Sequence, residues 1–114
     1  MKFQFKRVYD DPTPQDGLRV LVDRLWPRGI KKEALQHDLW LKEIAPSNEL
    51  RRYYHTTGDW DTFRERYEAE LDANPETVEK LKAMADDQPM TTLLYAARAD
   101  RRNHAMILGE YLSR

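Results

Sequence analysis

The sequence predicts an α/β protein: a single-domain three-layer fold in which a small, mostly parallel sheet is flanked by helices. Two nearly continuous apolar segments, residues 18–23 and 91–96, are typical of strands that are buried on both faces. Helical periodicity fills much of the chain between them, so crossover connections join the strands and make them parallel. A chain of 114 residues can bury one core, and we expect one domain over residues 1–114.

The first part of the chain is predicted to contain two strands, a loop, a short helix and one segment whose type is ambiguous. Residues 3–9 begin with alternating apolar and polar side chains, which indicates an edge strand. Residues 10–17 contain acids, two prolines and a glycine and form a loop, and residues 18–22 form the central strand. We expect a short helix at residues 31–36, whereas residues 38–44 fit a strand or a helix, and we favour the strand.

Three longer helices are predicted before the second apolar segment and one after it. Ser47 is the expected N-cap of the first, which ends near Gly58. The second carries one stripe of large apolar side chains at helical spacing: Trp60, Phe63, Tyr67 and Leu71. Asn74 and Pro75 begin the third, and the fourth covers residues 103–112 with Asn103 as its N-cap.

Composition excludes several classes of function. The charges nearly cancel, with 19 basic and 20 acidic residues, so no overall field attracts the protein to nucleic acid or to an anionic membrane. The absence of cysteine excludes disulfides and thiolate chemistry. The three histidines lie far apart and no glycine-rich phosphate loop occurs, so we expect neither a metal site nor a cofactor. No segment approaches the length of a membrane span, and we expect a cytoplasmic protein.

Arginine-bearing turns follow both apolar segments. The carboxyl ends of parallel strands meet at one edge of a sheet, where open α/β folds bind ligands. Guanidinium groups match the oxygens of carboxylates and phosphates, and a helix start at residue 103 adds backbone N–H donors. The sequence therefore predicts binding of an anionic, phosphate-bearing small molecule, with acid–base catalysis as an open addition. The predicted substrate-binding residues are Arg24, Trp26, Arg28, Arg98 and Asn103, and the predicted catalytic pair is Asp23 and His104.

Other interpretations of the same residues remain open. Asp23 and Asp100 can pair with the neighbouring arginines and merely hold the turns in place, Trp26 can close the end of the core, and His104 can be a cap. A different class of function is a nucleic-acid-binding regulator that contacts phosphates through residues 51–52 and 98–102. Self-association through aromatic surfaces is a third alternative, and the sequence does not determine the oligomeric state.

Several segments together resemble the short, YeaO-like branch of the DUF488 family, and the match covers nearly the whole chain. The segments are Lys6–Asp10, Arg19–Gly29 with its Val-Asp-Arg-Leu-Trp-Pro-Arg-Gly block, Asp38–Lys42, Ala45–Ser47, Thr92–Arg98 and Asn103–Ala105. Longer family members carry one cysteine on the last strand and another before the histidine of the following helix start. Here Tyr95 and Asn103 stand at those positions, so the resemblance implies no thiol chemistry, whereas Asp23, Arg24, Arg28 and His104 are retained.

Overall fold

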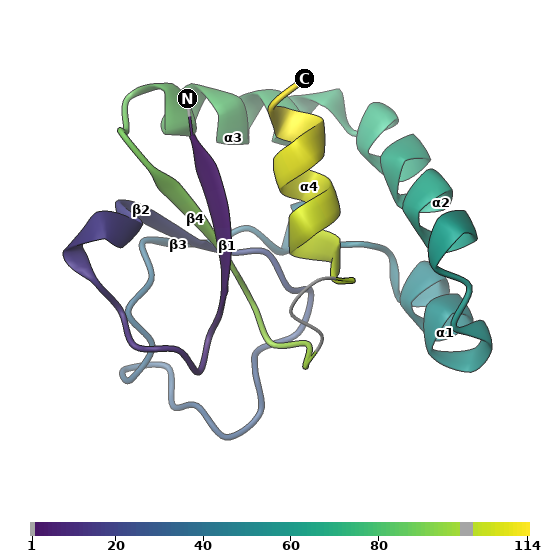
Figure 1. Ribbon diagram of the computed structural model, residues 1–114, viewed down its shortest axis with the longest axis horizontal. Helices are drawn as coiled ribbons and strands as arrows, with labels where there is room; N and C mark the ends of the chain where they lie inside the picture. Colours follow the sequence, from purple (N-terminus) through teal and green to yellow (C-terminus); the bar gives the residue numbers. More distant parts are fainter. Residues whose placement is uncertain (1, 99–101) are drawn as a thin grey trace.

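The computed structural model describes residues 2–98 and 102–114, and within them the chain forms a four-stranded parallel sheet (Figure 1). The strands are β1 (Phe3–Arg7), β2 (Leu18–Leu21), β3 (Leu39–Trp40) and β4 (Thr91–Tyr95), in the spatial order β1-β4-β2-β3. The two predicted central strands are direct neighbours, with Leu18 opposite Thr91 and Leu21 opposite Leu94. Their carboxyl ends therefore lie at the same edge, and β1 is the expected edge strand.

The predicted long helices are present with the expected starts. They are α1 (Asn48–Thr57), α2 (Trp60–Asp72), α3 (Pro75–Asp86) and α4 (His104–Leu112), with two short 3-10 helices, η1 (Pro14–Asp16) and η2 (Lys42–Ile44). Ser47 Oγ accepts from the backbone N–H of Leu50 at 3.1 Å, and Asn103 Oδ1 caps α4. Asn74 differs from the expectation, because its side chain donates to the Glu43 carbonyl at 3.0 Å instead of capping α3. No helix in these described ranges is long and apolar enough to cross a membrane.

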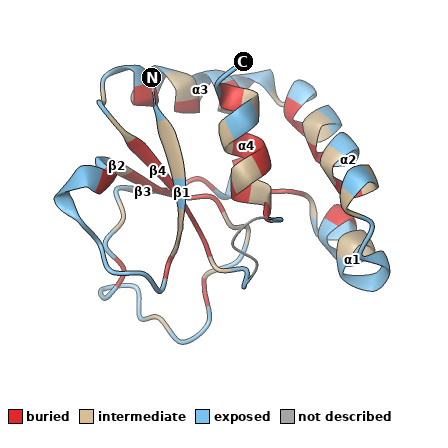
Figure 2. Cartoon of the chain, viewed as in Figure 1, coloured by how far each residue is buried: buried red, intermediate tan, exposed pale blue. Residues whose placement is uncertain are grey.

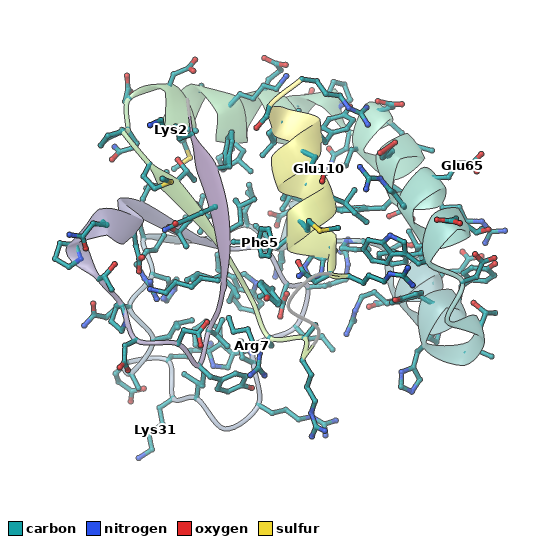
Figure 3. All side chains as sticks on the ribbon, in the orientation of Figure 1. Lys2, Phe5, Arg7, Lys31, Glu65 and Glu110 are labelled. Carbon is teal, nitrogen blue, oxygen red and sulfur yellow. The ribbon has the colours of Figure 1, made fainter. Side chains whose placement is uncertain are left out.

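One face of the sheet carries the helices and the larger part of the core (Figure 2). The predicted stripe of α2 points inward: Phe63, Tyr67 and Leu71 are buried, and Trp60 is partly buried. Tyr67 also donates from its hydroxyl to the Ile44 carbonyl at 2.7 Å, and its burial raises the pKa of the phenol. Glu65 lies on the outer side of the same helix (Figure 3). The stripe thus anchors α2 against the sheet.

The opposite face is covered by the connection of residues 22–38, so the α/β class is confirmed but this layer is not helical. Leu35 packs there with strand residues Leu21 and Leu94, and Trp26 closes the cluster. The predicted helix at residues 31–36 is wrong, because this segment forms only a turn. Burial of Leu35 and a hydrogen bond from Arg19 to the Gln36 carbonyl, at 2.6 Å, direct its backbone onto the sheet instead.

The expected strand at residues 38–44 forms only in part. Leu39 and Trp40 pair with β2, and the chain then turns into η2. The Leu41 N–H still donates to the Leu21 carbonyl at 2.9 Å, which places Leu41 in the core. The ambiguity of this short apolar segment reflects a change of backbone conformation within it.

A buried ionic cluster joins the loop before β2 to β1. Asp16 is 2% exposed and accepts from the backbone N–H of Thr13 at 3.0 Å and from Lys6 at 3.1 Å, and it also pairs with Arg19. Burial alone would raise the pKa of this carboxyl, but the hydrogen bonds from Thr13 and Lys6 outweigh it and lower the pKa from 3.8 to about 2. This cluster lies at the amino-terminal edge of the sheet, opposite the predicted site.

Candidate functional site

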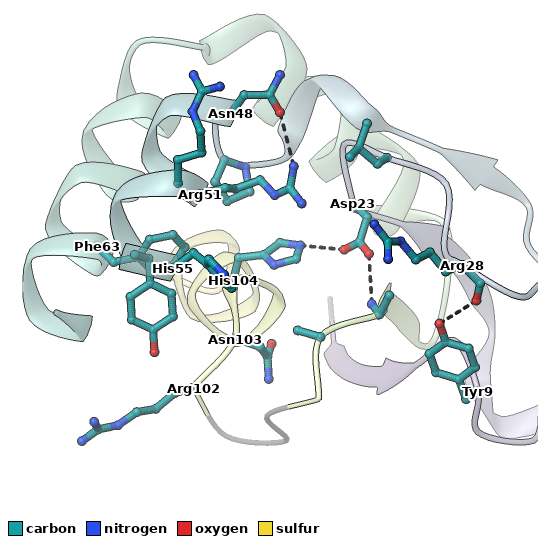
Figure 4. A pocket seen from close by; sticks show the side chains of 16 residues that line it. Tyr9, Asp23, Arg28, Asn48, Arg51, His55, Phe63, Arg102, Asn103 and His104 are labelled. Atoms are coloured by element: carbon teal, nitrogen blue, oxygen red, sulfur yellow. Dashed lines mark hydrogen bonds and ion pairs between the residues drawn. The ribbon is translucent and has the colours of Figure 1, made fainter. Parts of the chain in front are cut away.

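A cavity of about 800 Å³ opens at the carboxyl ends of β2 and β4, beside α1 and the start of α4 (Figure 4). Asp23 comes from the end of β2, and Asn103 and His104 come from the start of α4. Aromatic and apolar side chains form another part of the wall: Tyr9, Leu25, Tyr54 and Phe63. The sheet edge that the sequence predicts for a ligand therefore does border a cavity.

Asp23 joins the ends of the two central strands to α4. Its Oδ2 accepts from the backbone N–H of Ala96 at 3.0 Å, and its carbonyl accepts from Trp40 Nε1 at 2.7 Å. Its Oδ1 lies 3.0 Å from Nε2 of His104, and the same nitrogen lies 3.1 Å from the Val22 carbonyl. Oδ1 itself accepts no well-aligned hydrogen bond from the described residues, so its contact with the imidazole is electrostatic.

Basic side chains dominate the charged lining. The arginines among the described lining residues are Arg28, Arg51, Arg52 and Arg102, and Asp23 is the one carboxylate in that set. Arg51 donates to Asn48 Oδ1 at 3.3 Å, which is a neutral partner. None of these guanidinium groups forms an ion pair within residues 2–98 and 102–114. No described acid therefore pairs with the positive charge on this wall.

The structure brings Asp23, Arg28, Asn103 and His104 to this cavity, but it places the other predicted site residues elsewhere. Arg24 donates to the carbonyls of Ala45 and Pro46 at 2.9 and 3.1 Å and borders a separate hollow of about 130 Å³. Arg24 thus stabilises the chain before α1.

Trp26 and Arg98 also lie outside the cavity. Trp26 packs in the second core cluster and donates from Nε1 to the Ile30 carbonyl at 2.6 Å, which matches the packing alternative. Arg98 is exposed and does not line the cavity. Asp100 and Arg101, named in the pairing and nucleic-acid interpretations, lie outside the described residues. Asp23 forms no ion pair with Arg24 or Arg28 in the described structure.

The cavity also contains residues that the small-molecule interpretation of the sequence missed. Arg51 and Arg52 project from α1, and they entered the sequence interpretation only as possible nucleic-acid contacts. Tyr54 and Phe63 pack as a tilted pair with ring centroids 4.6 Å apart, and Tyr9 donates to the Arg28 carbonyl at 2.9 Å. The adjacent arginines after a clear N-cap were the available signal, but only the tertiary structure shows that α1 faces the strand ends.

A family model described as "Inactive DUF488-N3 subclade" matches residues 2–114, and the chain belongs to the DUF488 family. It is 50% identical to the uncharacterized protein YeaO of Escherichia coli K12 over 113 residues, which cover 98% of this chain and 97% of that protein. The uncharacterized proteins Mb3100c of Mycobacterium bovis and Rv3073c of Mycobacterium tuberculosis are 41% identical over 108 residues, or 94% of this chain and 90% of theirs. No solved structure gives a significant match. The family resemblance inferred from the motifs is confirmed.

Proposed function

We propose that this protein binds a phosphate-bearing small molecule in the cavity at the carboxyl ends of β2 and β4. The observation that carries the proposal is the charge of the lining: four described arginines, none in an ion pair with a described acid, surround a space that contains one described carboxylate. Guanidinium groups around a concave space, without an ion-pair partner among the described residues, favour a multiply charged anion with planar or paired acceptor oxygens.

The arrangement of the backbone supports the same ligand class. The amino terminus of α4 opens on the cavity, and its partial positive charge favours an anion there. Tyr54, Phe63 and Leu25 supply apolar surface for the uncharged part of a ligand. The volume of about 800 Å³ lies in the range of small-molecule sites and exceeds what phosphate alone would fill.

Binding, without turnover, is the function we favour for this site. The matching subclade is described as inactive, which supports a binding role over acid–base catalysis by Asp23 and His104. Asp23 also has a structural task, because it satisfies the Ala96 N–H between the two strand ends. The pair then forms the polar floor of a binding site.

The test is a thermal-shift and calorimetric screen of the whole protein against inorganic phosphate, pyrophosphate, ribose 5-phosphate and adenosine monophosphate. A ligand that binds only the native state raises the melting temperature. Replacing Arg28 or Arg52 with alanine should weaken binding about 10- to 150-fold, the effect of losing one charge-assisted contact.

Arg98→Ala is the matched control, because it removes the same charge from an exposed position outside the cavity. We expect it to bind within about twofold of the wild type, since an exposed charge beyond the site acts only through screened electrostatics. The proposal fails if none of these anions stabilises the protein, or if Arg98→Ala weakens binding as much as Arg28→Ala. Binding of an oligonucleotide with steep salt dependence, and of no small anion, would support a nucleic-acid-binding regulator instead.

A further inference from the structure

The surroundings of Nε2 determine which ring nitrogen of a neutral His104 carries the hydrogen. Nε2 lies 3.1 Å from the Val22 carbonyl oxygen and 3.0 Å from Asp23 Oδ1. A carbonyl oxygen can only accept a hydrogen bond, and so can the oxygen of an ionised carboxyl group. Nε2 therefore carries a proton. A neutral imidazole has one N–H, so Nδ1 of the neutral ring is left as a hydrogen-bond acceptor.

Nδ1 has no partner inside the described protein. It forms no hydrogen bond with any described residue, and it is not fully buried. The side chain is 14% exposed and lines the cavity, as Figure 4 shows. The ring of Tyr67 packs edge-on against the imidazole, with centroids 6.3 Å apart, and helps to hold its orientation. Nδ1 is thus a fixed acceptor at the cavity.

We propose that His104 selects ligands that carry a hydroxyl or N–H donor in addition to the phosphate group, and that Nδ1 accepts this hydrogen bond. The inference rests on the proposed function, because it identifies the residue that contacts the uncharged part of the same ligand. A phosphate dianion offers only acceptor oxygens, which the lone pair of Nδ1 repels, so phosphate belongs against the arginines. A phosphorylated sugar or polyol supplies both groups.

The experiment compares ribose 5-phosphate with pentyl phosphate, which has the same number of chain carbons and no hydroxyl groups. Calorimetry on the wild type and on His104→Phe measures both affinities. We expect the substitution to weaken the binding of ribose 5-phosphate about two- to tenfold, the effect of one neutral hydrogen bond. The affinity for pentyl phosphate should change by less than about twofold, because this compound makes no such bond. The ratio of the two affinities cancels any general weakening of the site.

A second measurement uses the wild type alone, in case the variant fails to fold. The ¹⁵N resonances of the imidazole report which nitrogen is protonated, and we expect the neutral His104 ring to carry its proton on Nε2. Ribose 5-phosphate should shift the Nδ1 resonance, and pentyl phosphate should not. A neutral ring protonated on Nδ1, or an equal response to both compounds, would overturn the inference.

The outcomes separate the two proposals. If neither compound binds and no other anion of the screen binds, the proposed function fails and the inference fails with it. If inorganic phosphate or pyrophosphate binds and ribose 5-phosphate does not, the proposed function stands and the inference is wrong. If both bind with affinities that His104→Phe changes equally, anion binding stands and the donor-accepting role of His104 is wrong. If inorganic phosphate binds more tightly than ribose 5-phosphate and shifts both ring nitrogens, the imidazole is doubly protonated and acts as a further anion contact.

Discussion

Replacement of Asp16 by asparagine should remove a defined part of the acid sensitivity of this protein. The carboxyl is buried and paired in the folded state, and its pKa falls from 3.8 to about 2. A folded-state pKa below the unfolded value contributes stability that is complete above pH ~4 and is lost as the pH falls toward 2. The difference corresponds to about 2 kcal/mol of unfolding free energy.

Urea denaturation followed by tryptophan fluorescence at several pH values between 5 and 2 measures this contribution. The free energy of unfolding of Asp16→Asn should fall less than that of the wild type across this range, by about 2 kcal/mol. At neutral pH the variant should be less stable, because Arg19 is 7% exposed and loses its buried carboxylate partner. Parallel pH profiles for the two proteins would refute the reasoning, as would an Asp16 carboxyl that titrates near 4 by NMR.

Three further substitutions test the packing. Phe63→Ala should cost about 3–5 kcal/mol in chemical denaturation, the range for a buried aromatic, and a loss below ~1 kcal/mol would contradict its place in the core. Gly17→Ala places a Cβ 2.1 Å from the Met90 carbonyl oxygen at a φ of +62°, so it should lower the melting temperature far more than Gly29→Ala, whose Cβ meets nothing within 4 Å. Arg24→Ala should lose about 1–3 kcal/mol of stability through two abandoned carbonyls while leaving phosphate affinity unchanged. Weaker phosphate binding at constant stability would instead assign Arg24 to the site.

The elements that could be predicted from sequence are those where one physical requirement dominates. The two central strands are buried on both faces, so their side chains show no polar alternation. The α2 stripe repeats over three turns, and Ser47 and Asn103 offer the side-chain oxygens that exposed backbone N–H groups need. Each of these signals is local, and each led to the correct element.

The positions that could not be predicted depend on direction and on distant partners. Asp23 and Arg24 are adjacent in the loop after β2, but their side chains have different partners: Asp23 meets His104, and Arg24 meets the carbonyls before α1. The sequence shows that these two charged residues are adjacent, but it does not show that their side chains contact different parts of the fold. Likewise, Arg51 reaches the cavity only because α1 is placed beside the sheet edge, which depends on residues far along the chain.

The spatial order of the strands has a consequence for how the chain assembles. β1 and β2 do not pair with each other, since both pair with β4, which begins only at Thr91. The pairings of β1 and β2 with β4 must therefore wait until nearly the whole polypeptide is present, and a portion that ends before Thr91 cannot form the four-stranded sheet. A chain that stops before Thr91 lacks the central strand and also His104. Synthesis of the last quarter of the chain thus completes both the sheet and the wall of the cavity.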